Sequence, residues 1–144
     1  ENNRSYTVIG DTVNLAARLE SANRIYGTQI LLGETTAQAL GPHFETREVD
    51  TIAVKGKTES TRIFELLGPA GQVPENVLRL REIYSQALLA YRAQDWDGAE
   101  MNFRACLELR PNDGPAVLLL KRTETLRRNG SGADWSSISQ LEEK

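Results

Sequence analysis

The sequence has little of several residue types that would point to particular classes of protein. It holds one cysteine, Cys106, and one histidine, His43, so it cannot form an internal disulfide or a zinc site built from a cluster of these residues. Its apolar runs are much shorter than the stretch of about 18 residues that a transmembrane helix requires. Its 17 Lys and Arg residues do not outnumber its 20 Asp and Glu residues, which argues against nucleic acid as the main partner.

What the sequence does contain is the composition of a folded protein. Of its 144 residues, 40% are hydrophobic and 26% are charged, as is usual for a globular domain. A chain of this length buries about two thirds of its unfolded surface, so folding requires no metal or disulfide. The chain begins with Glu1 rather than Met, and patterned sequence follows almost at once. We therefore expect it to be a piece of a longer protein.

Hydrophobic and turn patterns in residues 1–68 predict an α+β unit in the order β-α-β-α-β-β. The predicted strands cover residues 5–9, 28–32, 44–54 and 61–67, and the predicted helices cover residues 13–23 and 34–40. Glycine residues separate most of these elements, as expected at turns. This alternation favours helices packed on a mixed sheet.

The second part of the chain has a different pattern. Residues 69–75 are rich in Gly and Pro and predict a linker. Residues 76–144 then show helical periodicity over 76–93 and 96–110, and a third helix is predicted to end at about Asn129. We therefore predict an all-helical extension after the linker.

The first two helices of this extension resemble one tetratricopeptide repeat. Ala99 and Phe103 have the spacing of the second helix of that repeat, and Pro111 closes the unit at the expected distance. A plain three-helix appendage is the alternative interpretation. Because one repeat cannot bury its faces alone, we expect these helices to pack on residues 1–68 or on a second chain.

The most informative motif is YTVIGDTVNLAARLE, at residues 6–20. Asn14 and Arg18 are four residues apart, so they share one face of the predicted helix. An amide and a guanidinium at these positions could hold a sugar oxygen and a phosphate, and a helix N-terminus favours anions. From spacing alone, a solvated Asn and Arg pair on a helix surface is the simpler interpretation.

This motif closely resembles the C-terminal half of class III nucleotidyl cyclase catalytic domains. A second block, DTIAVKGK at residues 50–57, resembles the Lys-Gly-Lys turn of the same family, and the last predicted strand follows it. The two blocks occur in the family's order and lie within residues 1–68. The resemblance implies the C-terminal part of a ferredoxin-like cyclase domain, followed here by the tetratricopeptide-like extension.

The resemblance also implies roles for four residues. Asn14 matches the residue that orients the ribose, and Arg18 matches the residue that stabilises charge on the α-phosphate as the 3′-oxygen attacks. Lys55 matches the lysine that contacts the β- and γ-phosphates. Thr7 occupies the position that reads the purine, where a hydroxyl can bond an adenine edge. Thr7 favours ATP as the substrate, and a guanylate cyclase stays open as an alternative.

Cyclases of this family use Mg²⁺ or Mn²⁺, and the resemblance places the two metal-binding aspartates upstream of this stretch. Asp11 is more simply a helix cap, and Asp50 has no partner carboxylate at a suitable spacing. Phosphoryl chemistry needs metal ions to neutralise developing charge. We therefore expect the parent protein to be an adenylate cyclase that makes 3′,5′-cyclic AMP and pyrophosphate, and residues 1–144 to be inactive alone.

The family works as a head-to-tail dimer, so the resemblance implies a homodimer. The use of ATP and the single free thiol predict a cytoplasmic domain, in a parent that could carry a membrane anchor upstream. The alternative function is a protein-interaction module with a degenerate cyclase-like part, whose helical extension recruits partners. The intact Asn14 and Arg18 argue against that degeneration.

Overall fold

The structure is a computed structural model that describes residues 3–54 and 59–141, without the side chains of residues 3–14 and Val54. Its helices are α1 (Asn3–Tyr26), α2 (Glu34–Leu40), α3 (Glu75–Arg92), α4 (Trp96–Leu109) and α5 (Gly114–Asn129), with a short 3₁₀ turn at Gly41–His43. Its strands are β1 (Leu31–Gly33), β2 (Phe44–Val54), β3 (Thr61–Pro69) and β4 (Ser139–Leu141). The predicted mixed α/β class is therefore confirmed.

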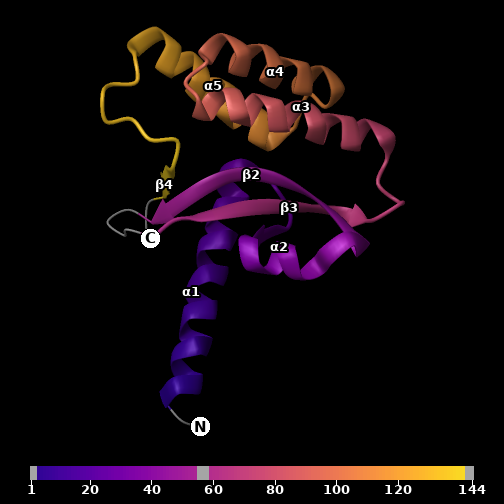
Figure 1. The fold of residues 1–144 in the computed structure, drawn as a ribbon, viewed down its shortest axis with the longest axis vertical. Helices are drawn as coiled ribbons and strands as arrows, with labels where there is room; N and C mark the ends of the chain where they lie inside the picture. Colours follow the sequence, from indigo (N-terminus) through magenta and orange to yellow (C-terminus); the bar gives the residue numbers. More distant parts are fainter. Residues whose placement is uncertain (1–2, 55–58, 142–144) are drawn as a thin grey trace.

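The described strands form one four-stranded sheet in the order β1-β3-β2-β4. The two long strands β2 and β3 are antiparallel, and β1 pairs with β3 in the same sense. The short strand β4 comes from the end of the chain and runs parallel to β2 (Figure 1). A parallel pair needs a long crossover connection. Along the sequence, the connection from β2 to β4 contains β3 and the three helices of the extension.

The helices α3, α4 and α5 form a layer along one side of the sheet, and α2 lies on the other side (Figure 1). Capping aspartates begin two of these helices: Asp95 accepts from the Gly98 amide at 3.1 Å and Asp113 from the Ala116 amide at 3.2 Å. The N-terminal half of α1 extends away from the sheet, and its C-terminal end reaches α5.

Two clusters of buried side chains make up the core. The first lies among the helices of the extension and includes Leu80, Tyr84, Ala87, Leu88, Tyr91, Ala99, Phe103, Cys106, Ala116, Leu119 and Leu120. The second joins the sheet to α1 and includes Ala22, Tyr26, Leu31, Val49, Ile52, Ile63 and Leu141. Because Leu118 of α5 packs against the second cluster, the extension contributes to both.

The contact between α1 and α5 depends on a glycine. A Cβ atom built at Gly114 would lie 2.0 Å from the carbonyl oxygen of Tyr26, far inside van der Waals distance. The first residue of α5 therefore approaches the last residue of α1 as closely as only glycine allows. The expectation that the helices pack on residues 1–68 agrees with this contact.

The prediction of a strand over residues 5–9 is wrong, because these residues belong to α1. Once the helix over residues 13–23 has formed, each added residue gains a backbone hydrogen bond at little cost, so a helix extends readily. In the described sheet the edge strands are β1 and β4, and residues 5–9 pair with neither of them. The order β-α-β-α-β-β is therefore replaced by α-β-α-β-β in this part of the chain.

The single cysteine should be chemically inert in the folded protein. Cys106 is fully buried in the helical cluster, and burial raises the pKa of its thiol to about 12. At pH 8 only about one thiol in 10⁴ would be ionised, and the thiolate is the reactive form. Ellman's reagent is therefore expected to release thionitrobenzoate from Cys106 only after urea unfolds the chain. Rapid, stoichiometric labelling of the folded protein would contradict this burial.

Candidate functional site

Helix α1 carries three of the four residues that the sequence singled out. Thr7 and Asn14 lie in its N-terminal half, and their side chains lie outside the described part of the chain. Arg18 is half-buried. The helical backbone places positions 14 and 18 about one turn apart, whereas Thr7 is separated from Arg18 by about 16 Å along the axis.

The fourth residue, Lys55, lies outside the described residues. The strand that leads to it, β2, is described up to Val54. The candidate site therefore involves two described segments. They are helix α1, which carries Asn14 and Arg18, and the end of β2 that precedes Lys55. The structure joins these two segments through a buried carboxylate four residues before Val54.

That carboxylate belongs to Asp50, which is fully buried. Its Oδ2 accepts a hydrogen bond from the Tyr26 hydroxyl at 2.5 Å and one from the Ser139 hydroxyl at 2.6 Å. Its Oδ1 accepts from the Thr51 amide at 2.8 Å. Arg122 Nη1 lies 3.5 Å from Oδ2 and donates to Ser139 Oγ at 2.7 Å. Residues of α1, β2, α5 and β4 thus meet at one group, which we call the Asp50 node.

Burial dominates the electrostatics of the node. It raises the pKa of Asp50, although the hydrogen bonds from Ser139, Tyr26 and the Thr51 amide act in the opposite direction. Burial and the charge of Asp50 also raise the pKa of Tyr26 above its usual range. Tyr26 therefore remains a protonated donor at physiological pH, and the node keeps its hydrogen bonds.

A second buried polar contact, between Arg47 and Asp113, connects β2 to the start of α5. Arg47 donates from Nη1 and Nη2 to the two carboxylate oxygens of Asp113, each at 2.9 Å, and also donates to Glu65. The side chains of Arg47 and Asp113 are each 1% exposed. The guanidinium carbon lies 4.8 Å from the ring centre of Tyr84, whose hydroxyl donates to the Val49 carbonyl at 2.7 Å. The bidentate pair fixes the orientation of the helical extension on the sheet.

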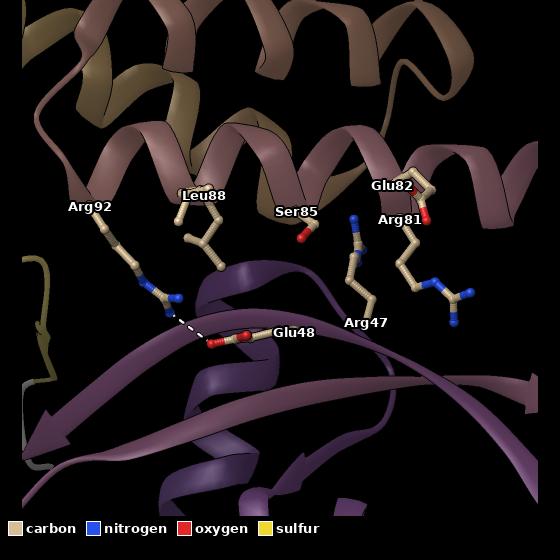
Figure 2. A pocket seen from close by; sticks show the side chains of 8 residues that line it. Arg47, Glu48, Arg81, Glu82, Ser85, Leu88 and Arg92 are labelled. Carbon is tan, nitrogen blue, oxygen red and sulfur yellow. Dashed lines mark hydrogen bonds and ion pairs between the residues drawn. The ribbon is translucent and has the colours of Figure 1, made fainter. Parts of the chain in front are cut away.

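A groove of about 350 Å³ lies between β2 and α3, and charged side chains line it (Figure 2). Arg92 donates to Glu48 at 2.9 Å, and Arg81 donates to Glu45 at 2.6 Å. Although partial burial acts the other way, hydrogen bonds from Arg62 and Arg92 lower the pKa of Glu48. Because Arg92 and Arg81 are already paired with carboxylates, these two side chains offer no free positive charge in the groove for a phosphate.

The described residues do not fit a metal centre. Among residues 3–54 and 59–141, the structure contains no group of three or more His, Cys, Asp and Glu side chains placed to hold a metal ion. In the same part of the chain, no helix combines the length and apolar character needed to cross a membrane.

Comparison with known proteins gives these positions a context. Residues 1–67 match the family model described as Adenylate and Guanylate cyclase catalytic domain. The matched segment contains Thr7, Asn14, Arg18 and Lys55. No solved structure matches the chain.

Three curated relatives carry the name adenylate cyclase. The terminal-differentiation specific adenylate cyclase of Dictyostelium discoideum is 32% identical over 85% of this chain and 6% of its own length. Adenylate cyclase 1 of Rhizobium meliloti is 36% identical over 44% of this chain and 10% of its own length. Adenylate cyclase of Anabaena cylindrica is 41% identical over 42% of this chain and 12% of its own length. The chain therefore spans a small part of each relative.

The Dictyostelium match extends beyond the cyclase segment. The family model ends at residue 67, which is less than half of the 144 residues, whereas this match covers 85% of the chain. A large part of the helical extension therefore also resembles that relative.

Sequence reasoning missed the partners of Asp50. It treated Asp50 only as a carboxylate without a nearby acidic partner, and it assigned no role to Tyr26, Arg122 or Ser139. No spacing rule links residues separated by as many as 89 positions, as Ser139 and Asp50 are. The local sequence provided no signal either, because Asp50 is one of several charged and polar residues along β2, whose sequence is FETREVDTIAV.

Proposed function

We propose that the protein to which this chain belongs is an adenylate cyclase, which converts ATP into 3′,5′-cyclic AMP and pyrophosphate. The observation that carries the proposal is the cyclase match of residues 1–67, which includes every residue singled out from the sequence. The adenylate cyclases among its relatives support ATP as the substrate. Thr7, with a hydroxyl at the position assigned to the purine, favours adenine over guanine in the same proposal.

In this reaction the ribose 3′-oxygen attacks the α-phosphorus, the bond to pyrophosphate breaks, and the 3′-hydroxyl loses its proton. Asn14 orients the ribose, so that the 3′-oxygen and the α-phosphate meet in a reactive geometry. Arg18, one helical turn further along α1, donates hydrogen bonds to the α-phosphate oxygens and stabilises the negative charge that develops on them. Lys55 holds the terminal phosphates. Mg²⁺ or Mn²⁺ would neutralise phosphate charge, and we expect the aspartates that bind it to lie upstream of this chain.

The proposal divides the chain into a cyclase segment at residues 1–68, a connection at 69–75 and a tetratricopeptide-like extension at 76–144. The buried Ala99 and Phe103 of α4 support the repeat-like assignment, because these positions form the interior of such a repeat. The proposal also includes a cytoplasmic homodimer, in which the metal-binding carboxylates of one protomer face Arg18 of the other.

Product analysis of the complete protein tests the function. With Mn²⁺ and either ATP or GTP, we expect cyclic AMP from ATP and little cyclic GMP from GTP, as measured by liquid chromatography and mass spectrometry. Residues 1–144 alone are expected to form neither product, because they lack the metal-binding half. Preferential conversion of GTP would favour the guanylate cyclase. A folded, dimeric protein that forms neither product would favour the interaction module.

A further inference from the structure

The tail of the chain returns to the sheet along a defined path. After α5 ends at Asn129, Trp135 packs edge-on against two aromatic rings of the helical layer. Its ring centre lies 5.5 Å from that of Tyr91 and 5.2 Å from that of Trp96. The chain then forms β4 at Ser139–Leu141. The tail is thus held at two separate points before it reaches the end of the described residues.

Strand β4 pairs with the end of β2 that leads to Lys55. Ser139 lies opposite Ile52, and Leu141 lies opposite Val54. Without β4, this edge of β2 would expose unpaired backbone groups. The tail therefore constrains the residues immediately before the turn that carries Lys55.

The first residue of β4 also takes part in the Asp50 node. Ser139 donates to Asp50 Oδ2 and accepts from Arg122, while Tyr26 donates to the same Asp50 oxygen. Tyr26 is the last residue of α1, and Arg18 lies about 12 Å earlier along that helix. One carboxylate therefore links the tail, the end of β2 and the helix that carries Arg18.

We propose that Ser139 and Asp50 are positioning residues, through which the C-terminal tail holds helix α1 and the Lys55 end of β2 in one fixed arrangement. This inference rests on the proposed function for its catalytic consequence. In the proposed site, Asn14 and Arg18 act on the ribose and α-phosphate while Lys55 holds the terminal phosphates. A shift of α1 relative to β2 would therefore separate the groups that contact the ribose and α-phosphate from the group that contacts the terminal phosphates.

The chemistry of the node explains why Ser139 matters more than other tail residues. Its hydroxyl is the only part of β4 that donates to Asp50 among the described contacts, and it also accepts from Arg122. Removal of that hydroxyl takes one hydrogen-bond donor from the buried Asp50 carboxylate and one acceptor from Arg122, which favours rearrangement of the node. Gln140, the next residue of β4, is exposed. Gln140→Ala is therefore a matched control in the same strand.

Hydrogen exchange in the complete protein tests the coupling without reference to activity. In Ser139→Ala, we expect the amides of residues 52–54 and 19–26 to exchange several-fold faster than in the wild type, because both segments lose a shared anchor. Gln140→Ala should leave both segments unchanged. Ser139→Thr keeps the hydroxyl in a residue that suits a strand and should restore protection. Unchanged exchange at residues 19–26 in Ser139→Ala would overturn the inference, whatever the activity.

Steady-state kinetics with ATP then test the catalytic consequence. We expect Ser139→Ala to lower kcat/KM by about tenfold to a hundredfold, as a small misplacement of reacting groups does, with Ser139→Thr close to the wild type. Wild-type activity in Ser139→Ala would overturn the positioning role. If the wild type forms no cyclic nucleotide while Ser139→Ala still accelerates exchange in both segments, the proposed reaction fails and the coupling of the tail to α1 stands.

Discussion

Arg18→Ala in the complete protein is expected to lower kcat for cyclic AMP formation by about 10²–10³-fold, the usual effect of removing one donor from a developing oxyanion. Arg18 is half-buried on α1, one turn after Asn14. A donor that the fold already places requires little reorganisation as charge develops. Because the interaction strengthens in the transition state, KM for ATP should change much less than kcat. Initial rates over a range of ATP concentrations separate the two parameters.

The same helix offers a matched control for Arg18. Arg24 lies in the last turn of α1, is exposed, and donates to Ser21 at 3.4 Å. Arg24→Ala removes the same charge from the same helix and should retain nearly full activity. Arg18→Lys should recover only part of the loss, because an ammonium lacks the planar fork of a guanidinium. Equal losses in the Arg18 and Arg24 variants would mean that Arg18 contributes only general charge.

Arg47→Met is expected to reduce the free energy of unfolding by about 3–5 kcal/mol, because the buried Asp113 carboxylate loses its bidentate partner and keeps only the more distant Arg110, at 3.7 Å, and the Ala116 amide. The free energy of unfolding of a typical domain is about 5–15 kcal/mol, so a loss of this size is a large fraction of the total. The pair that it breaks is bidentate, with both side chains 1% exposed. Urea unfolding of residues 1–144, followed by circular dichroism, measures the difference.

Two further variants establish the cause of that loss. Arg104 forms ion pairs with Glu100 and Glu124 on the surface, so Arg104→Met should cost no more than about 1 kcal/mol. Asp113→Asn removes the buried charge while keeping a residue that caps α5 well. The double variant Arg47→Met and Asp113→Asn should therefore be more stable than Arg47→Met alone. A double variant that is less stable would show that Arg47 acts through packing on Tyr84 instead.

The Arg47 pair and the Asp50 node have related consequences for the helical extension. Both place buried polar contacts between β2 and α5 or its N-cap, and Tyr26 of the node is also a member of the second apolar cluster. Apolar packing tolerates small displacements, whereas bidentate and multiply bonded groups specify one geometry. The extension is therefore held on the sheet in one orientation.

Several elements could be predicted from local patterns because their determinants are adjacent in the sequence. The predicted helix over residues 34–40 and strand over residues 44–54 are confirmed with the same bounds. The glycine at residue 41 ends the first of these by adopting a positive φ of 63°, as a glycine after a helix commonly does. Local patterns also placed the three helices of the extension to within about two residues at each end.

The errors occur where local preference competes with distant partners. The run over residues 5–9 has strand-like side chains, yet it forms helix because the adjoining helix extends through it. The prediction of an all-helical extension over residues 76–144 is wrong at its end, because Ser139–Leu141 form the strand β4, and three residues carry too little pattern to identify a strand. Its conformation depends on pairing with β2, which lies far away along the chain.

The candidate site shows the same division. The blocks at residues 6–20 and 50–57 predicted a cyclase sequence through their resemblance to that family, and the family match over residues 1–67 agrees. That inference depends on identity and order along the chain, which any sequence displays directly. The contact of the Gly114 position with Tyr26, by contrast, becomes meaningful only when α5 is packed on α1.

By itself the sequence determined the mixed α/β class, the helices of the extension and the similarity of residues 1–67 to cyclase catalytic domains, because each depends on neighbouring residues or on a motif. Only the tertiary structure decided that Asp50, Tyr26, Arg122 and Ser139 meet in one buried node. Burial makes unpaired polar groups costly, so the fold must bring distant partners together, and which partners meet depends on how the whole chain packs.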